Sequence, residues 1–451
     1  MLNKQISFFI LVFILSVSEI FAQNVKDTLS LTVEKAVTMA VDNNPDIKRV
    51  QLGNQLLETQ IAQAKSAGLP QVTGSAGFTD NFSIASQILP GEIFGQTGEI
   101  AVQFGTRYGL NAGVEINQLL YSREYRTNLN KLDATKHITQ LQVLSTMEDL
   151  VYNVVQVYIQ YQTTAEQQKL LYDNLDRIDQ LVEISNAQYE NGIIKKLDVD
   201  QIKVNRTNQL TNISNLNTKL EQQLNVLRFY LNLDRGLEIV LSEKLDNTSQ
   251  YPLSSTLMLS QNINYQILND RIELTKLEDE VIKAGYYPTV SAFAQYNYTG
   301  QANKLNFKSD NYTDFTAGLY GLTVSIPIFD GFNKKNKLAE NKILYEQQKL
   351  DLQTLKNNTK LEFNNANANL KQNQNLINTQ LENMDLATMV YDVTKLSYQE
   401  GVAALTDLID AENGLEDAQS QYLTALINYK LAELDHIKAS GQLAQLLSAN
   451  N

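Results

Sequence analysis

Two long stretches of the chain carry a helical pattern of apolar residues. From about Ser122 to Gln188 and from Asn333 to Ser397, apolar side chains recur at spacings of three and four, with many Gln, Asn and Thr residues between them. At a rise of about 1.5 Å per residue, each stretch predicts a helix roughly 100 Å long, which is more than a globular domain holds. Helices of this length are stable when they pack laterally as coiled coils.

Four shorter stretches alternate apolar and polar side chains, which is the pattern of β-strands. They begin near Val72, Tyr108, Val290 and Tyr320. The second strand carries Glu115 on its polar face, which fits either a barrel with a wet interior or a half-buried sheet of a soluble protein. Phe293 interrupts the polar face of the third strand. We expect loops at 80–103 and 301–313 between the strands of each pair.

Shorter helical patterns flank these elements. One helix is predicted from Thr32 to about Lys65, and Pro70 ends it because proline cannot continue a helix. Each long helix is followed by a predicted return helix, over 198–231 and 407–440. The segment 241–258 follows the first return helix and joins the two halves of the chain. It is expected to lie against the middle of the long helices, together with the C-terminal tail.

A short motif interrupts the helical pattern twice. Tyr-x-x-Gly occurs at Tyr189–Gly192 and Tyr398–Gly401, and an Asp follows each Gly by six positions, at Asp198 and Asp407. Glycine supplies the positive φ that a tight helix-to-helix reversal needs. The motif therefore predicts two hairpin tips.

The second tip is the more acidic one. We expect Thr406 to cap the return helix and Asp407 to lie in its first turn, where the helix dipole favours a carboxylate. Asp407 and Asp410 are three residues apart, so one helix face carries both carboxylates.

The repeated motif belongs to an internal duplication. Gly192 and Gly401 lie 209 positions apart, and the strand ends near Leu120 and Phe329 share that offset. Each half is expected to contain a helix, two strands, a very long helix, a tip and a return helix. This organisation predicts a signal peptide at 1–22, a first repeat at 23–240, an inter-repeat segment at 241–258 and a second repeat at 259–451.

The N-terminal residues and the composition indicate the compartment. Lys4 precedes an apolar run, and Phe21-Ala22 provides a cleavage site, as in secretory signal peptides. No later run of 18 apolar residues exists, so any membrane passage must use a closed β-barrel. Four strands cannot close a barrel, so the chain must oligomerise.

The residue types offer little chemistry. The chain of 451 residues has no Cys and two His, and its formal net charge is −13. The absence of Cys excludes disulfides. The negative net charge argues against nucleic acid as a partner, since binding to nucleic acid depends on Lys and Arg clusters. We find no catalytic constellation, no phosphate-binding loop and no metal or cofactor motif, so we expect no enzyme activity and no cofactor.

Several of these pieces together resemble the outer-membrane efflux protein (TolC-like) family. The matching sequences are Asp-Asn-Asn-Pro-Asp at 42–46, Gly-Leu-Pro at 68–70, Tyr-Tyr-Pro at 286–288, Ile-Pro-Ile-Phe-Asp-Gly at 326–331 and the repeated Tyr-x-x-Gly tip. The resemblance covers nearly the whole chain after residue 22. It implies a mixed α and β fold, in which a homotrimer forms a 12-stranded transmembrane β-barrel continued by a long α-helical barrel.

The resemblance also implies roles for residues at the tip. The family's acidic entrance rings fall on Asp407 and Asp410, and its tip-closing link falls on Tyr398 and Asp198. A second link of the family, from an Arg to a Thr, would fall on Ala403 and Leu197 and is therefore absent here.

The predicted function is a passive exit duct from periplasm to exterior. The duct would sit in outer-membrane lipid as part of a tripartite efflux or type I secretion system, with a periplasmic adaptor and an inner-membrane pump as partners and a gate at the periplasmic tip. The alternative is a periplasmic coiled-coil scaffold without a pore.

Overall fold

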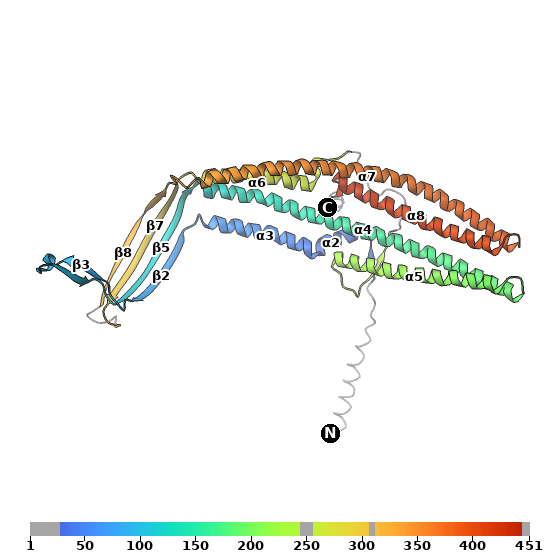
Figure 1. Cartoon of the computed structure of the whole chain (residues 1–451), viewed down its shortest axis with the longest axis horizontal. Helices are drawn as coiled ribbons and strands as arrows, with labels where there is room; N and C mark the ends of the chain where they lie inside the picture. Colours follow the sequence, from blue (N-terminus) through green and yellow to red (C-terminus); the bar gives the residue numbers. More distant parts are fainter. Residues whose placement is uncertain (1–27, 244–255, 306–311, 444–451) are drawn as a thin grey trace, which may run out of the picture. The chain divides into compact units, whose positions relative to one another are not determined.

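The computed structural model describes residues 28–243, 256–305 and 312–443 (Figure 1). The predicted signal peptide, most of the inter-repeat segment and residues 306–311 of the second loop lie outside this part. The chain divides into two compact units. The sheet unit comprises 51–142 and 264–355, and the tip unit comprises the ranges 1–50, 143–263 and 356–451.

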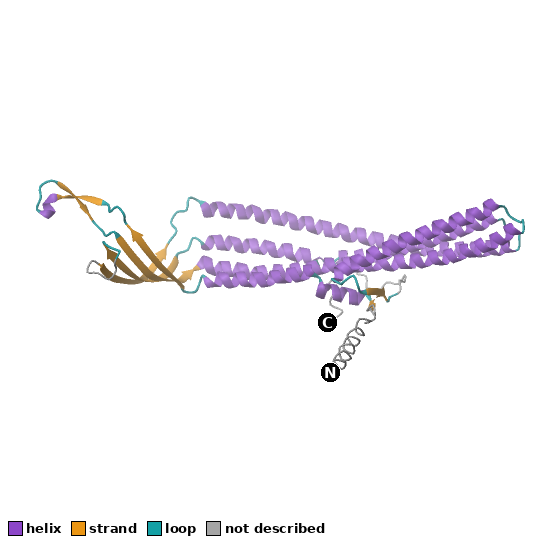
Figure 2. Ribbon diagram, turned by 90° about the horizontal axis from the view of Figure 1, so that it is seen from below, coloured by secondary structure: helices purple, strands orange, loops and turns teal. Residues whose placement is uncertain are grey.

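The sheet unit contains a four-stranded antiparallel sheet (Figure 2). Its spatial order is β2-β5-β7-β8, so the two central strands come from different halves of the sequence. The strands are β2 (Gln71–Asp80), β5 (Tyr108–Ser122), β7 (Thr289–Ala302) and β8 (Tyr312–Ser325). The alternating stretches thus form four strands, and β2 and β8 lie at the two edges.

The two faces of this sheet differ as the alternation predicts. One face carries apolar side chains, among which Val72, Val114, Tyr296 and Leu322 are exposed. The other face carries polar side chains such as Glu115 and its paired neighbour Gln295. Phe293, which interrupts the polar face, pairs in register with Gly321. A Cβ atom at Gly321 would lie only 3.0 Å from the Phe293 ring, so the ring occupies the space that the glycine leaves open.

Two expectations about the strands were wrong. Residues 80–103 are not a plain loop, because β3 (Ser86–Pro90) and β4 (Glu99–Gln103) pair as a second, two-stranded sheet around the short 3₁₀ helix η1 (Gly91–Phe94). The last strand ends at Ser325 rather than near Phe329. Pro327 lies just beyond that end, and proline has no N–H to donate to a neighbouring strand.

Parts of four helices complete the sheet unit. α3 (Pro45–Ser66), α4 (Arg123–Glu190) and α7 (Asn333–Gln399) contribute some of their residues, and α6 (Ile263–Ala284) contributes all but its first. Polar contacts link them: Lys131 Nζ of α4 lies 2.7 Å from Glu278 Oε2 of α6. Asn341 Nδ2 of α7 donates to Asp279 Oδ1 of α6 at 2.7 Å.

The tip unit contains two strands that the sequence did not predict, and the N-terminal part of the chain contains two helices that were predicted as one. β1 (Thr28–Leu31) pairs in parallel with β6 (Glu238–Leu241), and neither strand was predicted. The single helix expected over 32–65 is two helices, α2 (Val33–Asn43) and α3, separated at Asn44. The break follows from Asn44, whose Oδ1 accepts from Asp46 N at 2.9 Å, and from Pro45, which favours a first helical position.

The long helices of the tip unit match the predicted ranges closely. α4 and α7 end at Glu190 and Gln399, and the return helices are α5 (Lys196–Leu231) and α8 (Leu405–Ser440). A cluster that includes Leu31, Val154 and Leu227 forms the main core of the unit. In the described part of the chain, none of the helices is long and apolar enough to cross a membrane. A short 3₁₀ helix, η2 (Leu259–Gln261), precedes α6.

Candidate functional site at the hairpin tips

The two tips have the same backbone geometry. Gly192 and Gly401 have φ of 73° and 75°, in the left-handed region. The N–H of Gly192 donates to Tyr189 O at 2.9 Å, and that of Gly401 donates to Tyr398 O at 3.0 Å. These bonds satisfy carbonyl groups at the ends of α4 and α7, which lack partners inside their own helices. Each tip is therefore a helix end closed by a glycine.

The return helices also begin alike. The carboxylate of Asp198 accepts from Lys195 N at 3.0 Å, and that of Asp407 accepts from Ala404 N at 2.9 Å. The expectation that Thr406 caps α8 was wrong, because the helix starts at Leu405 and Ala404 is the cap residue. Asp407, three residues after the cap, satisfies the backbone N–H that would otherwise lack a partner.

The predicted entrance residues lie together on α8. Asp407 and Asp410 are both exposed, within the first two turns of the helix. Their counterparts in the first hairpin, at the same offset of 209, are Asp198 and Gln201. The second tip therefore has a carboxylate where the first has Gln201, whereas the second carboxylate of the first return helix is Asp200.

The tip-closing hydrogen bond differs from the expected one. The hydroxyl of Tyr398 donates to Gln188 Oε1 of α4 at 2.6 Å, whereas Asp198 is engaged with its own helix start. A phenol has one proton to donate, so the predicted Tyr398–Asp198 bond is not made in this conformation. Asp198 still affects the ionisation of the Tyr398 hydroxyl. Burial raises the pKa of Tyr398, and the negative charge of Asp198 raises it further.

Just below the tips, the two hairpins share a small apolar core. Its buried members from α4 and α5 are Ile178, Leu181 and Ile202, and those from α7 and α8 are Tyr391, Tyr398, Leu408 and Leu415. This core joins the two hairpins, so the tips cannot separate without exposing apolar surface to water.

A buried ion pair lies against this core, and the sequence reading missed it. Arg177 Nε donates to Glu412 Oε1 at 3.0 Å and to Oε2 at 3.2 Å, across the hairpins. The Arg177 guanidinium also lies 5.4 Å from the centre of the Tyr391 ring. Burial raises the pKa of Tyr391 to about 12, helped by the charge of Glu412. The sequence feature that could have indicated this ion pair is Glu412, a charged residue on the apolar face of the helix between Leu408 and Leu415.

Glu412 titrates differently from a surface carboxyl. Burial raises its pKa above the ordinary value, and Arg177 opposes that rise only in part. An ion pair of this kind is costly to break from one side, because the remaining charge stays buried without a partner. In the part of the chain that the structure describes, no group of His, Asp and Glu side chains is arranged to hold a metal ion.

The profile of the outer membrane efflux protein family matches residues 36–233 and 265–442. The chain belongs to this family, and the resemblance drawn from its motifs is confirmed. The protein is thus an outer-membrane component of efflux systems, with its helices in the periplasm.

Relatives of known name span most of the chain. TolC of Vibrio cholerae is 21% identical over 412 residues, covering 90% of this chain and 90% of its own length. TolC of Escherichia coli is 22% identical over 444 residues, covering 91% of this chain and 82% of its own length. Both are outer-membrane proteins by name, which agrees with the predicted location.

Solved structures of two channels share the fold. The CusC structure has a TM-score of 0.73 at 17% identity and covers 91% of this chain and 92% of its own. The CmeC outer-membrane channel of Campylobacter jejuni has a TM-score of 0.72 at 17% identity and covers 95% and 93%. The fold is therefore that of TolC-like channels, mostly helical with a small share of strands.

Proposed function

We propose that three copies of this chain form one exit duct through the outer membrane. The observation that carries the proposal is the four-stranded sheet with two unpaired edges, β2 and β8. Unpaired strand edges in lipid cost several kcal/mol per missing hydrogen bond, so the sheet must be continued by other copies. Three copies supply twelve strands, enough to enclose a channel.

The side chains of the sheet support its placement in lipid. Apolar residues such as Val72, Tyr296 and Leu322 stay exposed on one face, as expected of a lipid-facing surface. The face that carries Glu115 and Gln295 would line a water-filled interior. This division disfavours the alternative of a periplasmic scaffold, which has no use for an apolar outer surface.

The gate of the duct is proposed at the hairpin tips. Asp407 and Asp410 would form two carboxylate rings around the entrance when three copies meet, and rings of this kind attract cations. Closure would rest on the Tyr398–Gln188 hydrogen bond and the Arg177–Glu412 ion pair, which join the hairpins of one chain. Opening would require both the hydrogen bond and the ion pair to break. A periplasmic adaptor and an inner-membrane pump would be the partners that drive this opening.

Cross-linking tests the assembly directly, because the chain has no native cysteine. We would place one Cys on β2 and one on β8, at several pairs of positions, and oxidise the purified protein. A closed ring predicts covalent species of two and three chains, together with channels in planar bilayers. A Cys pair on the central strands β5 and β7 is the control and should link only within one chain. Monomers that wash off membranes with carbonate would refute the duct.

A further inference from the structure

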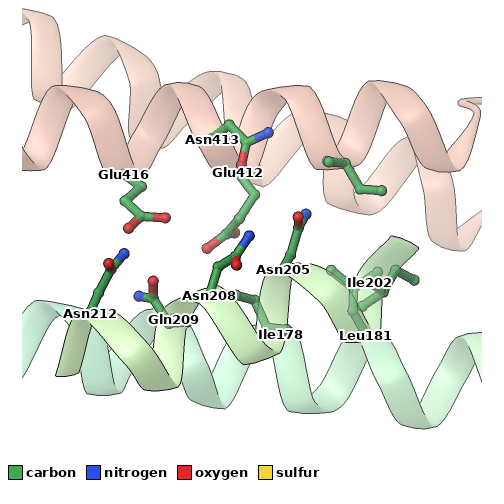
Figure 3. Close-up of a pocket in the computed structure, with 11 residues that line it drawn as sticks. Ile178, Leu181, Ile202, Asn205, Asn208, Gln209, Asn212, Glu412, Asn413 and Glu416 are labelled. Carbon is green, nitrogen blue, oxygen red and sulfur yellow. The ribbon is translucent and has the colours of Figure 1, made fainter. Parts of the chain in front are cut away.

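The chain has a formal net charge of −13, but its charges are distributed unevenly. In the tip unit, Glu412 and Glu416 of α8 face the amides of Asn208 and Gln209 of α5 across a small cavity (Figure 3). In the sheet unit, basic residues gather in the four segments where a helix adjoins a strand. These segments, which we call the junction rim, contain seven basic and two acidic residues; they are 64–69, 119–126, 282–287 and 326–337.

The junction rim lies at one end of the four-stranded sheet. Its segments connect α3 to β2, β5 to α4, α6 to β7 and β8 to α7. The antiparallel register places Thr289 opposite both Ser122 and Ser325, so these strand ends are neighbours (Figure 1). Because the helices lie in the periplasm, this end of the sheet faces the periplasm. A sheet that spans the outer membrane therefore brings the junction rim to the membrane leaflet on the periplasmic side.

The junction rim exposes large apolar side chains. Ile328, Phe329 and Phe332 are 94%, 73% and 60% exposed. Ile328 prolongs the alternation of Leu322 and Val324, which are exposed on the apolar face of β8. The Phe329 and Phe332 rings contact each other edge to face, with centroids 5.3 Å apart. The apolar face of the sheet thus continues into the junction rim, as expected of a surface that contacts lipid.

Cationic side chains lie at the border of this apolar surface. The guanidinium carbon of Arg123 is 4.0 Å from the centre of the Tyr287 ring, and Lys335 Nζ is 5.6 Å from the centre of the Phe332 ring. Arg126, one turn after Arg123, is exposed, as are Arg123 and Lys335. Within the described residues, none of these three side chains pairs with a carboxylate. They are therefore positive groups that are free to bind an anion.

Phe332 has an unusual backbone conformation. Its φ is 65°, in the left-handed region that disfavours residues with a Cβ atom, and it follows Gly331 with a φ of 67°. Its carbonyl accepts from Asn336 N at 3.0 Å, so the residue lies at the start of α7. Glycine or asparagine would fit this turn with less strain. A large exposed ring here indicates a contact outside the chain, and the neighbouring Lys335 indicates that the partner carries negative charge.

We propose that the junction rim binds anionic phospholipids of the membrane leaflet on the periplasmic side. Phosphate groups would bind Arg123 and Arg126 beside β5 and Lys335 beside β8, and acyl chains would lie against Phe329 and Phe332. Basic residues at a membrane surface attract anionic lipids, and aromatic rings lie at the level of the head groups. The proposal rests on the placement of the sheet in lipid, which belongs to the proposed function, and does not depend on conduction.

The test is native mass spectrometry of the purified full-length protein, released from detergent micelles that contain equal amounts of phosphatidylglycerol and phosphatidylcholine with the same acyl chains. Wild type should retain phosphatidylglycerol in several-fold excess. Replacing Arg123, Arg126 and Lys335 together with Gln should abolish the excess, since each basic residue near a membrane surface contributes about 5-fold to binding. Equal retention of the two lipids by wild type, or an unchanged excess in this triple variant, would overturn the proposal.

A matched control removes the same number of charges elsewhere. Lys219, Lys360 and Lys371 are exposed residues of helices in the tip unit, and their joint replacement with Gln should leave the lipid excess unchanged. An excess that is lost in the control as well would show that retention follows only the total charge, which also overturns the site.

Phe332→Asn tests the aromatic ring. Asparagine tolerates a positive φ, so thermal stability in detergent without lipid should not fall, while retention of both lipids should drop several-fold. Unchanged retention would contradict the acyl-chain contact. A loss of oligomer stability without lipid would make Phe332 a contact between copies of the chain and overturn its lipid role. Planar-bilayer conductance is measured separately, so a wild type that conducts without preferring the anionic lipid would refute this site and leave the duct standing.

Discussion

Asp198 and Asp407 hold the same place in the two hairpins. They lie 209 residues apart, and each carboxylate accepts from the backbone N–H three residues before it, at 3.0 and 2.9 Å. Both carboxylates therefore secure the start of a return helix. Any role that Asp407 has at an entrance is added to this capping role, and a substitution that tests the entrance has to preserve the cap.

Replacing Asp407 and Asp410 together with Asn should weaken block by a trivalent cation. Asn keeps the size and still accepts a hydrogen bond at the helix start, while the ring charge is lost. Planar-bilayer recordings with and without the cation measure the effect. Asp200→Asn, at an exposed position of α5, is the control and should behave as wild type. Unchanged block in the double variant would place the cation site elsewhere.

Tyr398→Phe should raise the conductance of the isolated channel. It removes the donor to Gln188 and keeps the ring in the core, which costs the closed state about 0.5–1.5 kcal/mol. Combined with Gln188→Ala it should add little, because both changes remove one interaction. Combined with Asp198→Ala the effects should be closer to additive. The reverse pattern would make Asp198 the partner of Tyr398 in the assembled channel.

Arg177→Met should destabilise the tips more than any surface change. It leaves Glu412 buried without its partner, at a cost of about 3–5 kcal/mol. The double variant Arg177→Met with Glu412→Leu should recover most of that loss, since no charge then remains to be paired. Protease sensitivity of the tips and the thermal stability of the oligomer measure both. A double variant as unstable as the single one would mean that the ion pair itself supplies the stability.

The stability of wild type relative to Glu416→Gln should depend on pH. The pKa of Glu416 is raised by burial, so the folded protein binds the proton more tightly than the unfolded chain. Protonation of Glu416 therefore stabilises the fold. This stabilisation is fully present at pH values below the ordinary pKa of a glutamate and is lost as pH rises through the raised pKa of Glu416 in the folded protein. Glu416→Gln should gain stability over wild type at neutral pH and lose that gain in acid. Parallel pH profiles of unfolding would contradict this.

Two glycines of the second hairpin should respond in opposite ways to alanine. Gly401 has a φ of 75°, so Gly401→Ala should destabilise by about 1–2 kcal/mol. Gly414 lies inside α8, and a Cβ atom added there would meet no atom within 4 Å, so Gly414→Ala should stabilise by about 0.5–1 kcal/mol. Thermal unfolding of the two variants gives the comparison. A neutral Gly401→Ala would show that the tip can adopt another turn.

The sequence predicted those elements whose pattern is long or repeated. The bounds of α4 and α7 agree within two residues, because dozens of apolar positions share one period and a glycine marks each end. β1 and β6 were missed, since four-residue strands 210 positions apart leave no local pattern. The Tyr398 contact was assigned to Asp198 because the family resemblance places its tip-closing link on these two residues. The resemblance indicates which residues lie at a tip. It does not show which of them a hydroxyl can reach once Asp198 is engaged by Lys195 N.

The order of strands in the sheet has a consequence for biosynthesis. β5 pairs with β7, and residues 123–288 separate the two strands. Closing so long a loop is slow, and the pairing cannot begin before β7 has left the ribosome. Until then β5 keeps one edge open, a surface prone to aggregation that cells must shield during export. Each repeat therefore encodes two strands, but the central pair of the sheet needs one strand from each repeat.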